Sequence, residues 1–211
     1  MTILQAILGF ATVAAILTVI PGLDTTLVLR SALVRGRRQA VATALGIATG
    51  ALVWGAAAAL GAAALLAASH LAYQIVTIGG ALYMGYIGVS MIVQSFRRAG
   101  NGHGAAATTE SASLWRSFLT GTWTNLLNPK IGVFYIATIP QFIPEGTSTL
   151  AMGLLLSAVH ALMSLVWFAI IIIGANAARR WLAHARALRL IDRVAGTVLI
   201  GFGAKLALDH R

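Results

Sequence analysis

Two charged residues stand inside long apolar stretches of the sequence, each close to a proline. Asp24 lies three residues after Pro21, and Lys130 directly follows Pro129. A charge near the centre of a bilayer costs about 2.5 to 3.5 kcal/mol on insertion scales, so such residues usually pair or face a polar cavity. In one interpretation Asp24 binds the ammonium group of a solute or a proton, while Lys130 binds the solute's carboxylate or neutralises Asp24. In the other, the two residues form a structural ion pair between two halves of the chain.

The sequence predicts a break in the helix at each of these prolines, at Pro21-Gly22 and at Asn128-Pro129. Carbonyl and amide groups freed by unwinding must find partners, because hydrocarbon offers none. A bound solute is one such partner, and a kink satisfied by Thr25, Thr26, Asn125 or water is the alternative. Asn125 and Asn128 lie three residues apart, on one side of a helix, and we expect one of them to reach a cavity.

Three further side chains are weaker candidates for lining this cavity. Tyr83 and Tyr86 lie three apart in an apolar stretch and could form a wall, although aromatic packing explains them equally well. His160 lies well inside another apolar stretch, where it is either a hydrogen-bonded interior residue or a proton relay. One histidine makes no metal site, and the chain has no cysteine, so we expect neither a metal nor a cofactor.

The composition indicates what kind of solvent surrounds these residues. Of the 211 residues, 59% are hydrophobic and 9% charged, against about 45 to 50% and about 25% in soluble domains. A bilayer solvates apolar side chains directly, so the chain is predicted to be an integral membrane protein. The net charge of +10 does not predict nucleic-acid binding, because the basic residues form clusters between long apolar runs.

Six segments are long and apolar enough to cross a bilayer, which requires about 20 residues. They cover residues 3–34, 40–68, 71–96, 115–142, 148–174 and 190–208. The first and the fourth contain the two predicted breaks, and the others are predicted to be continuous. The predicted fold is therefore an all-α polytopic membrane protein with six transmembrane helices, of which helices 1 and 4 are broken.

Arginines mark alternate connections between these segments. The first, third and fifth connections together hold eleven of them: Arg30, Arg35, Arg37, Arg38, Arg97, Arg98, Arg116, Arg179, Arg180, Arg186 and Arg189. The second and fourth connections have no Lys or Arg, and the fourth carries Glu145. By the positive-inside rule, the odd connections face the cytoplasm and both termini lie outside.

A segment rich in Gly, Ala, Ser and Thr, residues 99–113, divides the chain near its middle and is predicted to be a cytoplasmic linker. Three spans on each side (residues 1–98 and 114–211) give the two halves opposite orientations. A shift of 108 residues aligns Pro21 with Pro129, and a shift of 116 aligns residues 80–86 with 196–202. Both breaks also lie roughly 20 Å from an arginine anchor, at 1.5 Å per helical residue. These features predict two inverted repeats, an architecture of secondary transporters that bind solutes near the midplane.

The motifs that carry these features resemble the LysE/RhtB family of bacterial amino-acid exporters. The similar segments are PGLDTTLVLR at 21–30, GRR at 36–38, LGIATG at 45–50, TNLLNPK at 124–130 and PQF at 140–142. One position departs from the family pattern, which is usually Pro-Gly-Pro-Asn or Pro-Gly-Pro-Asp. Here Leu23 replaces the second proline and restores a backbone donor.

The resemblance implies an inner-membrane carrier that expels amino acids or their derivatives, driven by the proton gradient or the membrane potential. By motif position it transfers a binding or coupling role to seven residues: Pro21, Gly22, Asp24, Asn125, Asn128, Pro129 and Lys130. Glycine-lined helices, which pack closely, are compatible with a homodimer. Export of another solute or a metal cation is the nearest alternative. A membrane enzyme or an assembly subunit is a more distant one, since no catalytic motif is present.

Overall fold

The computed structural model describes residues 1–69, 113–175 and 177, together with scattered positions within 71–96 and 190–204. Its helices are α1 (Ile3–Val19), α2 (Leu23–Val34), α3 (Arg37–Ala68), α5 (Leu114–Leu126), α6 (Pro129–Thr138), the short 3-10 helix η1 (Ile139–Phe142) and α7 (Thr149–Ile173). Every described position within 71–96 and 190–204 is also helical. The chain is thus a helical polytopic membrane protein, as the sequence predicts.

Within the described residues, α3 and α7 are each long and apolar enough to cross a membrane, and α1 and α2 together make a third, bent span. The angle between α1 and α2 is 53°. The helices α5 and α6 have 13 and 10 residues and are each too short to cross alone. The total of six spans and the inverted repeat remain predictions.

Both predicted helix breaks are present, and proline chemistry explains each. Ile20, which precedes Pro21, is extended with φ −65° and ψ 119°, and it ends α1 because proline disfavours helical geometry in the residue before it. Asn128 is likewise extended, and Pro129 starts α6 at the first helical position, where its missing N–H costs nothing. Leu23, at the family's second proline position, is the first residue of α2.

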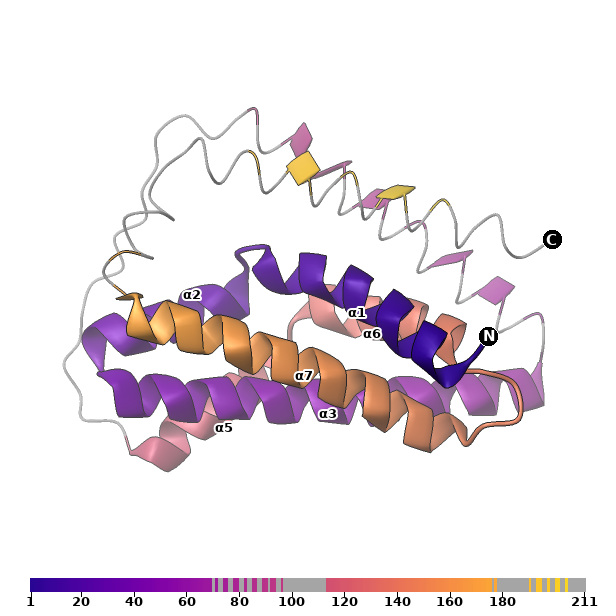
Figure 1. Cartoon of the computed structure of the whole chain (residues 1–211), viewed down its shortest axis with the longest axis horizontal. Coiled ribbons are helices and arrows are strands. Elements are labelled where there is room, and N and C mark those ends of the chain that lie inside the picture. Colours follow the sequence, from indigo (N-terminus) through magenta and orange to yellow (C-terminus); the bar gives the residue numbers. More distant parts are fainter. Residues whose placement is uncertain are drawn as a thin grey trace.

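Helix α3 is the central element, and α5 and α7 pack along it (Figure 1). Glycines allow the closest contacts: a Cβ added to Gly46 would overlap the carbonyl oxygen of Phe118, and one on Gly121 would overlap that of Thr43. Gly46 and Gly121 therefore lie where α3 and α5 pack most closely. A Cβ on Gly79 or Gly85 would meet no atom of the described residues within 4 Å.

Five of the described arginines lie at one end of the molecule. Figure 1 places the α2–α3 connection, the start of α5 and the end of α7 at that end, while the N-terminus and the η1–α7 connection lie at the other. The first end carries Arg30, Arg35, Arg37, Arg38 and Arg116, and the second carries Glu145. This asymmetry is the one that the positive-inside rule uses, although the orientation itself remains a prediction.

Candidate solute-binding site

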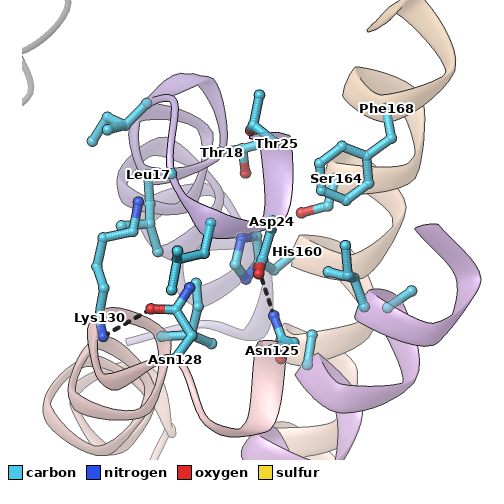
Figure 2. A pocket seen from close by; sticks show the side chains of 17 residues that line it. Leu17, Thr18, Asp24, Thr25, Asn125, Asn128, Lys130, His160, Ser164 and Phe168 are labelled. Atoms are coloured by element: carbon cyan, nitrogen blue, oxygen red, sulfur yellow. Dashed lines mark hydrogen bonds between the residues drawn. The ribbon is translucent and has the colours of Figure 1, made fainter. Parts of the chain in front are cut away.

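A small buried cavity lies where the two helix breaks meet α3 and α7. Its volume is about 30 Å³, which is room for about two water molecules. Figure 2 shows the side chains that surround it, which come from α1, α2, α3, α5, α6 and α7. Two apolar clusters contribute residues to its wall. One contains Phe10, Phe134 and Leu156, and the other contains Val28 and Phe168.

Six of the ten residues predicted for the site line this cavity: Gly22, Asp24, Asn125, Asn128, Lys130 and His160. Pro21 and Pro129 form the breaks themselves, and neither is among the lining residues. Tyr86 does not line the cavity, and 67% of its surface is exposed. Tyr83 lies outside the described residues.

Asp24 occupies the first turn of α2, directly after the break. Its Oδ2 accepts a hydrogen bond of 2.8 Å from the side-chain amide of Asn125, 101 residues away (Figure 2). Its Oδ1 is buried and has no hydrogen-bond partner within the part of the chain that the structure describes. Burying an ionised oxygen without a partner is costly, so this atom is ready to accept a ligand's proton donor.

Asn125 is held in place from several directions, and its side chain is only 2% exposed. Its backbone carbonyl accepts one hydrogen bond of 3.4 Å from the indole N–H of Trp54 and one of 3.1 Å from the backbone N–H of Asn128. The Asn125 Oδ1 atom faces Gly50, where an added Cβ would lie 2.8 Å away. Trp54 therefore positions a site residue, a role that the sequence did not distinguish from packing or contact with lipid.

Asn128 and Lys130 begin the second half-helix. The Asn128 side chain caps α6 by accepting a bond of 3.1 Å from the Lys130 backbone amide. The Lys130 side chain extends to the first break, where its Nζ lies 3.1 Å from the position of an added Cβ on Gly22. Gly22 therefore leaves room for this ammonium group. A cation and an anion from different halves of the chain thus line one cavity.

His160 was expected to be a hydrogen-bonded interior residue or a proton relay, and the structure shows the hydrogen bond. Its Nδ1 lies 2.8 Å from the hydroxyl of Tyr135, which is fully buried. Ser164, one turn further along α7, also lines the cavity and is 8% exposed. The sequence analysis missed Tyr135 and Ser164. A signal for Ser164 existed, because Ser157, His160 and Ser164 recur at helical spacing in an otherwise apolar span.

The rest of the cavity wall is mainly apolar, with hydroxyl groups between the apolar side chains. Its large apolar members are Leu17, Ile20, Leu23, Ile47, Ile131 and Phe168. Thr18, Thr25 and Ser164 supply the hydroxyls. Among the described residues, no group of three His, Cys, Asp or Glu lies close enough together to hold a metal ion. The lining suits a small organic solute with both polar and apolar parts.

A protein-family model, the LysE type translocator, matches residues 15–210. The chain belongs to this family. The match covers both helix breaks and every described residue that lines the cavity.

Two of the relatives of this LysE type translocator are named as amino-acid efflux proteins. The threonine efflux protein of Salmonella typhimurium is 30% identical over 90% of this chain and 91% of its own length. The leucine efflux protein of Enterobacter is 29% identical over 93% of this chain and 92% of its own length. The membrane protein YrhP of Bacillus subtilis is 28% identical over 98% of this chain and 100% of its own length. No solved structure matches the chain. At the level of the family, the chain is a bacterial membrane translocator related to amino-acid efflux proteins.

Proposed function

We propose that this translocator is a secondary active exporter that carries amino acids or their derivatives out of the bacterial cytoplasm. The observation that carries the proposal is that Asp24 and Lys130, from different halves of the chain, line one buried cavity at the two helix breaks. The relatives that are named threonine and leucine efflux proteins support a zwitterionic amino acid as the solute. No covalent chemistry is needed.

In this proposal each charged end of the solute has a partner. The ammonium group binds Oδ1 of Asp24, which is buried and lacks a hydrogen-bond partner among the described residues. The carboxylate binds Lys130 and the N-terminus of α2, which Gly22 leaves without a side-chain cap. Free backbone amides and the helix dipole favour an anion at such an end.

The same carboxylate provides a route for energy coupling. Asp24 can hold either an ammonium group or a proton, so the two ligands compete for one site. Outward movement with solute and return with a proton would make export depend on the proton gradient, while net charge movement would link it to the membrane potential. We place the protein in the inner membrane with its arginine-rich end in the cytoplasm and both termini outside. A homodimer remains a prediction.

The test is efflux from bacteria that lack their own amino-acid exporters and are loaded with dipeptides. Wild-type protein should release amino acids, identified by mass spectrometry, faster as the external medium is acidified. Asp24→Asn preserves the size of the side chain and an acceptor for Asn125 but removes the charge. We expect a loss of efflux of roughly tenfold or more, the loss expected when a charged hydrogen bond is removed, together with the loss of the pH response.

Glu145→Gln is the matched control, because it makes the same chemical change at an exposed loop position away from the cavity. Wild-type rates and pH response in Asp24→Asn would refute the role of the carboxylate. No release by wild-type protein that has reached the membrane would point to another solute.

Lys130→Ala, alone and combined with Asp24→Asn, separates binding from a structural ion pair. In a structural pair, Lys130→Ala should reduce the membrane yield and the double variant should restore it without restoring transport.

A further inference from the structure

We infer, on the basis of the proposed export function, that the solute is an amino acid with an uncharged side chain, and that basic and acidic amino acids are excluded. The inference rests on the charges that the cavity offers. Among the described residues that line it, Asp24 is the one anion and Lys130 the one cation. The cavity therefore supplies one partner for an ammonium group and one for a carboxylate.

No second carboxylate is available from the rest of the described chain. The sequence has five acidic residues. Besides Asp24, the structure describes Glu145, which is exposed in the connection between η1 and α7. The other three are Glu110, Asp192 and Asp209, which lie in the linker and at the two ends of the predicted sixth span.

A zwitterion bound between Asp24 and Lys130 leaves every charge in the cavity compensated. Lysine or arginine would bring a second cation with no anion to meet it, and glutamate or aspartate would bring a second anion. An uncompensated buried charge weakens an interaction by about 100-fold or more. The apolar walls formed by Leu17, Ile47 and Phe168 offer no charged group to replace the missing partner.

Ser164 offers a position at which the charge balance can be changed. It is 8% exposed and lines the cavity, and Figure 2 shows its hydroxyl pointing from α7 toward Asp24. Aspartate here would add a second carboxylate and would compensate a cationic side chain. Asparagine has nearly the same size as aspartate and adds no charge, so it is the matched control.

The test compares release of threonine, leucine, lysine and glutamate from exporter-deficient cells loaded with the corresponding dipeptides. Wild-type protein should release threonine or leucine at least about 100-fold faster than lysine or glutamate, the factor expected for an uncompensated charge. Ser164→Asp should gain lysine release, and Ser164→Asn should not.

The outcomes separate the two proposals. Release of lysine or glutamate by the wild type at the rate of the neutral amino acids would overturn this inference and leave the export function in place. No release of any amino acid would overturn the export function itself. Failure of Ser164→Asp to release lysine, in protein that still releases neutral amino acids, would also overturn the inference. If Ser164→Asp does not reach the membrane, the selectivity of the wild type is by itself the test of the inference.

Discussion

Replacing Gly50 with alanine tests whether the position of Asn125 controls Asp24. A Cβ at position 50 would lie 2.8 Å from Asn125 Oδ1 and 3.1 Å from the carbonyl oxygen of Thr122. Ordinary contacts of a Cβ begin at 3.4 Å. The carbonyl belongs to the backbone of α5 and can move little. The side-chain amide of Asn125 must therefore move away by about 0.6 Å, the difference between 2.8 and 3.4 Å. Its hydrogen bond to Asp24, now 2.8 Å, would then approach or exceed the upper limit of about 3.2 Å.

The size of the effect follows from the kind of bond that is lost. A hydrogen bond to a charged group contributes about 1.5 to 3 kcal/mol, which corresponds to roughly a 10- to 150-fold change in an equilibrium. Alanine also favours a helix over glycine by about 1 kcal/mol, so α3 itself should not be weakened. We therefore expect Gly50→Ala to reach the membrane and to transport at least about tenfold more slowly than the wild type.

The assay is the rate of amino-acid release from dipeptide-loaded cells, divided by the amount of protein in the membrane. Gly61→Ala is the control on the same helix, because a Cβ there would meet nothing within 4 Å. It should transport at the wild-type rate. Wild-type transport by Gly50→Ala would show that Asn125 can move without disturbing Asp24, and the argument that the bond holds the site together would fail.

Two further substitutions test the packing and the buried polar pair. Gly46→Ala should lower the melting temperature in detergent, since its Cβ would overlap the backbone carbonyl of Phe118 and overpacking costs about 1 to 3 kcal/mol. A melting temperature equal to that of Gly61→Ala would contradict this. Tyr135→Phe keeps the ring but leaves His160 without its partner, which should cost about 1 to 3 kcal/mol of unfolding free energy. An unchanged melting temperature in Tyr135→Phe would mean that the bond adds no stability.

Local features of the sequence were enough to predict the helices and their breaks. Pro21 and Pro129 act on their own neighbourhoods, because each removes a donor and restricts the residue before it. The predicted segments 3–34 and 115–142 accordingly appear as α1 with α2, and as α5 with α6 and η1.

The contacts between helices were not predictable in the same way. Periodicity indicates which residues share a face of one helix, but it does not fix how two helices are rotated against each other. The sequence therefore left open whether Lys130 pairs with Asp24 or binds the solute, and it did not predict the hydrogen bond from Asn125 to Asp24. Tyr86 was placed beside the cavity for the same reason, and it is exposed.

The small cavity constrains how the proposed exporter can work. A volume of about 30 Å³ holds about two waters, whereas even a small amino acid needs several times that space. We therefore expect the helices to move apart as a solute binds. The bond between Asp24 and Asn125 joins α2 to α5 across the cavity, and an ammonium group arriving at Asp24 competes for the same carboxylate. On the proposed mechanism, this competition lets solute binding loosen the contact that keeps the two halves together.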